Sequence, residues 1–230
     1  MDLRLHEYKH YFLTCNNEVR RQHFLQEFAH LDVTAVHANP AIPKHQSGAA
    51  GFSRVLDLAA QNQDATKPFQ PFGIFEDDVT QYREFPASLI VPDDVDLLYV
   101  GLSSCGMNEN YFCGTVHFEN VSADVIRVYN MLALHGVMVC SLRGALALQR
   151  AFSESFHTGT IWDVYTAQLQ PHYHVYALRV PLVYQSGVLG GQEEATKVQF
   201  ATHDNPHIPA HWINTTNASV LPAIPPNVQI

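Results

Sequence analysis

Three consecutive carboxylates, Glu76, Asp77 and Asp78, directly follow the short apolar run of residues 72–75. The run predicts a buried strand, so the carboxylates are expected at the carboxyl edge of a sheet, where open α/β folds bind ligands. A divalent cation, Mn²⁺ or Mg²⁺, would relieve their mutual repulsion by taking carboxylate oxygens together with the phosphate oxygens of a substrate. The pattern therefore predicts a site for a metal-bound diphosphate. The alternative is that the three residues begin a solvated turn.

The elements around these carboxylates are predicted to alternate between strands and helices. Apolar and β-branched runs predict strands, and apolar residues at helical spacing predict helices. Strands are expected at residues 11–15, 32–37, 72–75, 96–101, 115–118, 125–132, 136–140 and 173–184, and helices at 18–31, 52–62, 142–152 and 160–169. Residues 40–51, rich in Pro, Gly, Ser and Ala, are expected to form a loop.

This order of elements predicts an α/β fold with a Rossmann-like mixed, mostly parallel sheet flanked by helices. The three strands expected between residues 115 and 140 are joined by short connections, which is typical of antiparallel pairing. No repeat or linker divides the chain, so residues 1–230 are expected to form one domain, with an irregular tail from about residue 187 to 230.

Composition excludes several classes of protein. Of the 230 residues, 47% are hydrophobic and 15% are charged, and no apolar run reaches the length of a membrane span. The net charge of −9, with basic residues scattered along the chain, argues against a nucleic-acid groove. The four cysteines form no C-x-x-C pair and are expected to be reduced thiols: Cys15, Cys105, Cys113 and Cys140. With a charged N-terminal segment in place of a signal peptide, they predict a cytoplasmic protein.

Several segments, in a fixed order, resemble the nucleotide-sugar glycosyltransferases of the GT-A fold, and in particular glycosyltransferase family 25, the lipopolysaccharide and collagen galactosyltransferase type. The resemblance covers about residues 11–186 and rests on the order of the segments. They read SGAAGFSRVLDLA, FGIFEDDV, DLLYVGLS, VMVCSLRGALALQRAF and HVYALRVPLVYQS. It implies a GT-A-like domain that transfers a hexose from a nucleotide-diphosphate sugar, with a UDP-sugar as the expected donor, to a hydroxyl of a glycan or glycoconjugate.

The resemblance also implies roles for the acidic residues. Asp78 would be the principal ligand of Mn²⁺ or Mg²⁺, with Glu76 and Asp77 as the other motif positions and His203 as a further ligand candidate. Asp163 resembles the aspartate that takes the acceptor's proton in inverting enzymes. The alternative for Asp163 is a reciprocal helix cap with Thr160.

The remaining candidates implied by the resemblance contact the two substrates. The candidates for nucleotide contacts, which include two arginines that could bind phosphate or simply lie on a solvated helix, are Thr14, Cys15, Asn16, Arg20, Arg21 and Asn39. The acceptor is expected to meet Trp162, Gln185 and Ser186, although Trp162 could equally pack inside the protein.

Two other functions remain open at this point. Residues 76–80 nearly match the D-x-D-x-T motif of haloacid-dehalogenase-type phosphatases, but Glu76 stands where that family needs its nucleophilic aspartate. The chain could also be a catalytically decayed protein that binds a nucleotide or a sugar. Such a binder would not hydrolyse a nucleotide sugar even with Mn²⁺ present.

Overall fold

The computed structural model describes residues 1–108 and 113–191, and its centre is an eight-stranded mixed sheet. The strand order is β10-β11-β13-β7-β12-β4-β2-β3. The strands are β2 (Lys9–Thr14), β3 (Asp32–His37), β4 (Phe72–Glu76), β7 (Leu97–Tyr99), β10 (His117–Asn120), β11 (Val125–Asn130), β12 (Gly136–Val139) and β13 (Val175–Leu178). The pairings make β12 and β11 run against the other strands, which confirms the predicted mixed, mostly parallel α/β sheet.

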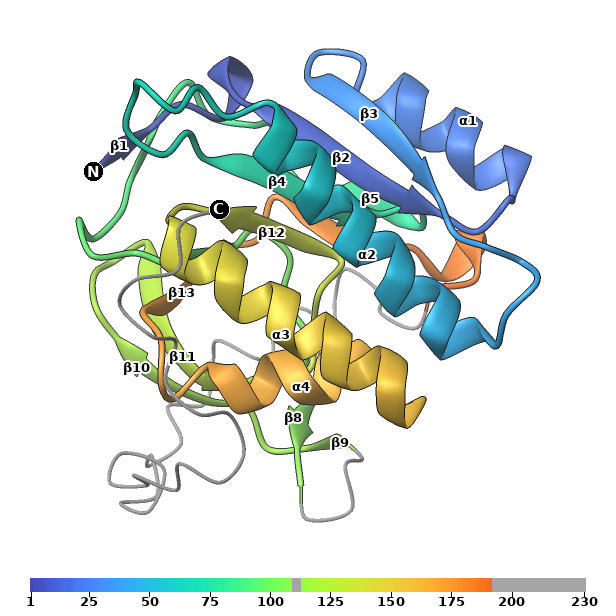
Figure 1. The fold of residues 1–230 in the computed structure, drawn as a ribbon. Helices are drawn as coiled ribbons and strands as arrows, with labels where there is room; N and C mark the ends of the chain where they lie inside the picture. The colour runs from blue at the N-terminus through green and yellow to red at the C-terminus, as the bar shows by residue number, and fades with distance from the viewer. Residues whose placement is uncertain (109–112, 192–230) are drawn as a thin grey trace.

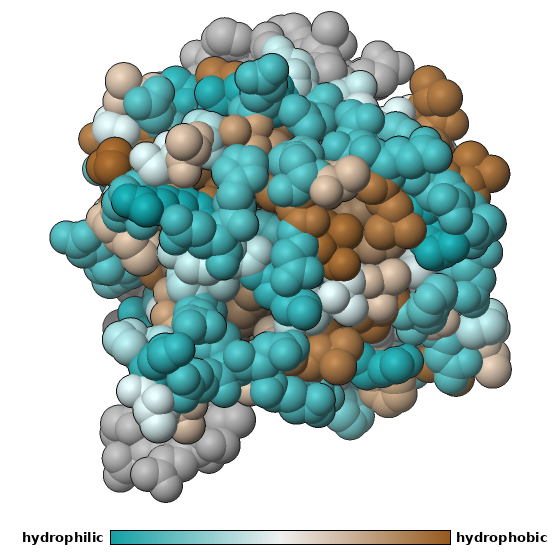
Figure 2. All heavy atoms as spheres, turned by 90° about the horizontal axis from the view of Figure 1, so that it is seen from above, coloured by the Kyte–Doolittle hydropathy of each residue, from teal (hydrophilic) through white to brown (hydrophobic). Residues whose placement is uncertain are grey.

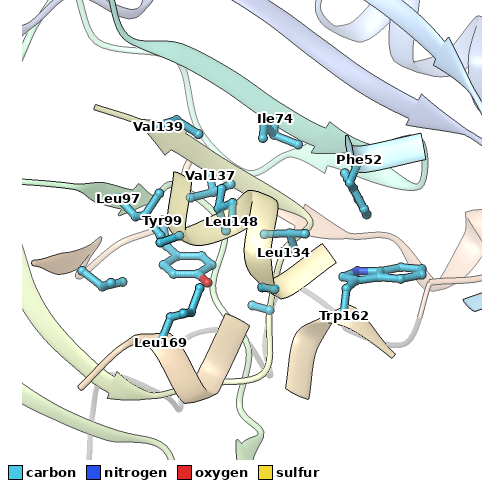
Figure 3. Packing of buried hydrophobic residues seen from close by; sticks show 14 of the residues in the cluster. Phe52, Ile74, Leu97, Tyr99, Leu134, Val137, Val139, Leu148, Trp162 and Leu169 are labelled. Atoms are coloured by element: carbon cyan, nitrogen blue, oxygen red, sulfur yellow. The ribbon is translucent and has the colours of Figure 1, made fainter. Parts of the chain in front are cut away.

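Helices cover both faces of this sheet, and alternate residues of each strand enter a different core (Figure 1). Helices α2 (Lys44–Gln61), α3 (Leu142–Thr158) and α4 (Trp162–Leu169) lie on the face that buries Tyr11, Ile74 and Tyr99. Figure 3 shows the part of this core around Tyr99 and Val137. Helix α1 (Glu18–Glu27) covers the opposite face, where Phe24 stacks on Phe12 with ring centroids 4.2 Å apart.

Helix α2 begins eight residues earlier than predicted, at Lys44 rather than residue 52, so the loop expected at residues 40–51 is wrong over most of its length. Its small residues serve close packing. A methyl group on Gly48 would lie 2.1 Å from the Trp162 ring, and one on Gly51 would lie 2.3 Å from Leu13. Helix α2 therefore approaches both α4 and the sheet at positions that only glycine can occupy.

Other predicted elements agree with the structure apart from their ends. Ser141 caps α3, because its hydroxyl accepts a hydrogen bond from the Gly144 backbone N–H at 3.0 Å. The long strand expected at residues 173–184 is instead two strands, β13 and β14 (Val183–Gln185), interrupted around Pro181, and β14 pairs with β5 (Val79–Gln81). The shorter elements are β1 (Asp2–Leu3), β6 (Leu89–Ile90), β8 (Gly106–Met107), β9 (Cys113–Gly114) and the 3₁₀ turns Leu5–Glu7 and Gly187–Leu189.

The cysteine prediction is wrong for Cys105, which is disulfide-bonded, whereas Cys15 and Cys140 are free thiols. Cys105 directly precedes β8, and the hairpin of β8 with β9 returns the chain alongside it. Because disulfides persist mainly in oxidising compartments, the cysteines no longer argue for a reducing one.

The surface in Figure 2 is covered largely by hydrophilic side chains, with hydrophobic patches between them. The most exposed large hydrophobic residues of the described chain include Val19, Ile90 and Val188. None of the described helices combines the length and the apolar character needed to cross a membrane. Most of the predicted irregular tail, from residue 192 onward, lies outside the described residues, as does His203.

Candidate active site

The acidic residues lie where β4 ends, at the carboxyl edge of the parallel strands β3, β2 and β4. Asp77 and Asp78 are buried, at 2% and 7% exposure, so the solvated-turn alternative is wrong for these two residues. The Glu76 backbone N–H donates to the His135 carbonyl oxygen at 3.3 Å, just before β12 begins. Asp163 of α4 brings the number of carboxyls at this edge to four. It lies close enough to Glu76 and Asp78 for their charges to affect one another's pKa values.

Donors from three distant segments hold the acidic residues in place. The Cys15 backbone N–H donates to Asp77 Oδ2 at 3.1 Å. Arg20 Nη1 lies 3.3 Å from Asp77 Oδ1 and 3.4 Å from Asp78 Oδ2. Gln185 Nε2 donates to Glu76 Oε2 at 2.7 Å and reaches Asp78 Oδ1 at 3.4 Å. Gln185 therefore binds the acidic cluster directly, and Ser186 does so through its backbone N–H, which donates to the Asp78 carbonyl oxygen at 2.8 Å.

Burial raises the pKa of three of these carboxyls, Glu76, Asp78 and Asp163. It is the largest cause of the raised pKa of Glu76, and the charges of Asp78 and Asp163 raise it further. The pKa of Asp78 is also raised by burial, although the Arg20 guanidinium pulls it down. Burial followed by the charge of Asp78 raises the pKa of Asp163 to about 7. The cluster therefore holds protons at a pH where ordinary carboxyls have lost them.

Asp163 does not cap its helix. Helix α4 has Ile161 at its N-cap with no side-chain capping bond, and the Thr160 N–H donates to Thr158 Oγ1 at 3.2 Å. The reciprocal-cap alternative is therefore wrong. Asp163 Oδ1 is buried and has no hydrogen-bond partner among the described residues, which leaves one carboxylate oxygen free to accept a proton.

Trp162, a candidate for stacking on a sugar, packs inside the protein instead. Its side chain is only 9% exposed, and its ring meets Phe52 edge to face with centroids 5.3 Å apart (Figure 3). The indole N–H partly offsets the raised pKa of Glu76, yet within the described residues no hydrogen bond of normal geometry reaches Trp162 Nε1. This buried donor therefore has Glu76 as a neighbour, at a geometry outside that of an ordinary hydrogen bond.

The residues expected to contact a nucleotide divide into two groups. Thr14, Cys15 and Asn16 end β2 at the same edge as the acidic residues, and Asn16 has a left-handed φ of 59°. Arg20 reaches the cluster as described. Arg21 instead pairs with Glu18 at 2.7 Å on the surface of α1, and Asn39 Oδ1 accepts from the Ala41 backbone N–H at 3.0 Å. Arg20 therefore lies near the end of β2, whereas Arg21 lies on the solvated surface of α1.

Lys44 is a basic residue of this edge that sequence reasoning missed. Burial and the charges of Asp77 and Glu76 raise the pKa of the Cys15 thiol, whereas Arg20 and Lys44 lower it, so Lys44 lies within electrostatic reach of the end of β2. Its place could have been found by reading Pro43 as the start of a helix, because proline is common where helices begin.

The carboxylates fit a divalent cation only in part. Across the described residues, no three His, Cys, Asp or Glu side chains form a ready-made metal cage. Mg²⁺ and related ions, however, are often held by one or two carboxylates together with substrate phosphates and water. Glu76 and Asp78 can supply that smaller set, because one nitrogen, Gln185 Nε2, lies 2.7 Å from Glu76 Oε2 and 3.4 Å from Asp78 Oδ1.

Comparisons with known proteins assign no family. No family model and no curated protein matches the chain. Among solved structures, A197 from STIV is similar over 76% of this chain and 83% of its own, with 11% identity and a TM-score of 0.41. The CTP:phosphocholine cytidylyltransferase LicC from Streptococcus pneumoniae is similar over 77% of this chain and 72% of its own, with 10% identity and a TM-score of 0.41. Similarity this distant says nothing about the activity of this chain.

Proposed function

We propose that the protein is a metal-dependent glycosyltransferase that moves a hexose from a nucleotide-diphosphate sugar to a hydroxyl group. One observation carries the proposal: Asp163, with an unpaired buried oxygen and a pKa of about 7, faces the carboxylates at the end of β4. Strand ends of this kind bind ligands in α/β folds. A proton acceptor beside a cluster suited to a metal-bound diphosphate is the arrangement that such a transfer needs.

Glu76 and Asp78 would hold Mn²⁺ or Mg²⁺ through the oxygens that now face Gln185 and Arg20. The cation, once bound, would neutralise the charge that develops on the departing diphosphate. The end of β2 and the basic side chains of Arg20 and Lys44 would orient the nucleotide. A UDP-sugar is the donor to test first.

Asp163 would act as the general base that takes the proton from the acceptor hydroxyl. A general base works best when its pKa lies near the operating pH, and burial has moved the pKa of Asp163 to about 7. Direct attack by a hydroxyl activated in this way inverts the configuration of the sugar. The buried and tightly packed Trp162 fixes the start of α4 and so holds the neighbouring carboxylate in position.

The phosphatase alternative finds less support in the same geometry. Its nucleophile is an aspartate, whereas Glu76 stands at that position and its Oε2 accepts a hydrogen bond from Gln185 Nε2 at 2.7 Å. A decayed binder is distinguished by activity, because it would bind nucleotide with metal but neither transfer nor hydrolyse the sugar.

The proposal is tested by calorimetry and a product assay with UDP-, GDP- and CMP-sugars, with and without Mn²⁺, on three variants. Asp78→Asn is expected to abolish metal-dependent nucleotide binding. Asp163→Asn is expected to keep that binding and to lower sugar transfer or hydrolysis by about 10²–10⁴-fold, the usual contribution of a general base. Asp57→Asn, on the exposed face of α2, is the matched control. If no nucleotide binds the folded wild-type protein, the proposed function is wrong.

A further inference from the structure

Arg20 occupies a position that a cation would otherwise take. Helix α1 begins at Glu18, and the Asn17 side chain accepts from the Arg20 backbone N–H at 3.2 Å, which fixes the first turn next to the end of β4. From there Arg20 Nη1 reaches Asp77 and Asp78 at once, at 3.3 and 3.4 Å. A single nitrogen thus bridges two adjacent carboxylates, as a small cation would.

Carboxyl groups outnumber basic groups at this site. Within residues 1–108 and 113–191, Arg20 is the one basic side chain in direct contact with the cluster formed by Glu76, Asp77, Asp78 and Asp163. Its Nη1 lies against one oxygen of Asp77 and one of Asp78. A divalent cation that takes the same oxygens as ligands must therefore displace Arg20.

The contacts of Arg20 are weak and its donors are largely unused. Charge-assisted N–H···O⁻ bonds are usually 2.7–2.9 Å long, so distances of 3.3 and 3.4 Å describe a loose pair. Arg20 Nε is buried and has no partner in the described chain. Arg20 Nη2 lies beside Gly190, where a methyl group would come within 2.9 Å of it. The guanidinium therefore keeps donor groups that its two carboxylate partners do not use, and these can donate to the oxygens of a phosphate once the side chain moves.

Trp162 gives a second indication that the cluster receives a ligand. Its indole N–H, in a side chain that is 9% exposed, has no hydrogen bond of ordinary geometry in the described chain, and its contact with Glu76 is only close enough to lower that carboxyl's pKa. A buried donor normally has a well-placed acceptor, because leaving it unpaired costs about 1–3 kcal/mol. An oxygen brought in by a ligand would supply one.

We propose that Arg20 is an exchangeable counter-ion that neutralises Asp77 and Asp78 in the free protein, leaves them when a divalent cation enters, and then donates to the phosphate of the metal-bound ligand. The part of this inference that concerns phosphate rests on the proposed function. The competition between Arg20 and the cation depends only on the carboxylates. Arg20 would thereby keep metal affinity low in the absence of ligand and raise it when a diphosphate is present.

The test is a titration of Mn²⁺ into the wild-type, Arg20→Gln and Arg21→Gln proteins, with and without inorganic pyrophosphate. Free Mn²⁺ is measured by its electron paramagnetic resonance signal. Arg20→Gln is expected to bind Mn²⁺ alone about 5–20-fold more tightly than wild type, because removing a competing charge at about 3–4 Å is worth on the order of one factor of ten in a partly exposed site. The same variant should lose most of the affinity that pyrophosphate adds. Arg21→Gln, which loses only its pairing with Glu18, should match wild type in both titrations.

An unchanged or weaker Mn²⁺ affinity in Arg20→Gln overturns the exchange. A tighter Mn²⁺ affinity in Arg20→Gln, with no effect of pyrophosphate on any of the proteins, supports the competition between Arg20 and the cation. The same result overturns the proposed diphosphate ligand. The failure of the exchange and the failure of the proposed function can therefore be told apart. Arg20→Lys covers the case in which Arg20→Gln does not fold. It keeps the charge but loses the planar fork, so it should bind Mn²⁺ within about 3-fold of wild type and still lose the pyrophosphate gain.

Discussion

The raised pKa of Asp163 predicts that removing its charge stabilises the protein, by an amount that grows above about pH 4 and is complete above about pH 7. An aspartate in an unfolded chain has a pKa of 3.8, against about 7 in the folded protein. Between these values the folded state holds a proton that the unfolded state has lost, so stability falls as the pH rises from about 4 to about 7. Below this window the carboxyl is neutral in both states and contributes nothing.

The size of the effect follows from the same two values. At about 1.4 kcal/mol for each pKa unit, burial of an ionised Asp163 costs up to about 4 kcal/mol above pH 7. Asp163→Asn keeps the shape of the side chain and removes its charge. It also removes the repulsion between Asp163 and Glu76, which raises the pKa of Glu76. The buried amide retains part of the desolvation cost. We therefore expect the variant to be about 2–4 kcal/mol more stable than wild type at pH 8 and within about 1 kcal/mol of it at pH 4.5.

The assay is urea unfolding of both proteins in EDTA, followed by circular dichroism at pH 4.5 and pH 8. Asp57→Asn, exposed on α2, should change stability by less than about 0.5 kcal/mol at either pH. The reasoning is refuted if the Asp163→Asn difference is the same at both pH values, or if the variant is less stable than wild type at pH 8.

Three further changes test the packing that supports the site. Gly48→Ala forces a methyl group against the Trp162 ring and should destabilise the protein by about 1–3 kcal/mol in thermal unfolding, so an unchanged melting temperature would contradict the close approach of α2 and α4. Gln170→Leu removes the side chain that bonds both the N–H and the carbonyl oxygen of Met131, and a loss of about 2–4 kcal/mol is expected in urea unfolding; a neutral result would mean that these groups find other partners. Ser141→Ala removes the cap of α3 and should cost about 1 kcal/mol by the same measurement, whereas Ser141→Thr should restore most of it.

The local part of the site could be predicted from the sequence, because it depends on neighbours in the chain. An apolar run followed by carboxylates is enough to predict a buried strand with acidic residues at its end, and β4 with Asp77 and Asp78 confirms this. The start of α2 was mispredicted for a physical reason. Gly48 and its neighbours have the composition of a loop, and only the position of Trp162, more than a hundred residues later, shows that small side chains are needed there.

The long-range part of the site could not be predicted. Nothing near Arg20 in the sequence distinguishes it from Arg21, yet Arg20 meets Asp77 and Arg21 meets Glu18. The choice depends on which face of α1 is turned toward the end of β4. Gln185 was expected to border the acceptor, which stays a prediction, and its bond to Glu76 was not foreseen, because it depends on the pairing of β14 with the strand that directly follows the carboxylates.

The pairing of Gln185 with Glu76 and Asp78 also has a consequence for synthesis of the chain. Its side chain joins residues 109 and 107 positions away, so the acidic cluster acquires this donor only after nearly all of the described chain has left the ribosome. Contacts of such long separation form late, because closing the intervening loop costs entropy before the contact stabilises anything. A nascent chain that ends before β14 would carry Glu76 and Asp78 without this partner. Release of the last segments is therefore the step at which the cluster becomes complete, and shortened chains should be targets for proteolysis around residues 76–78.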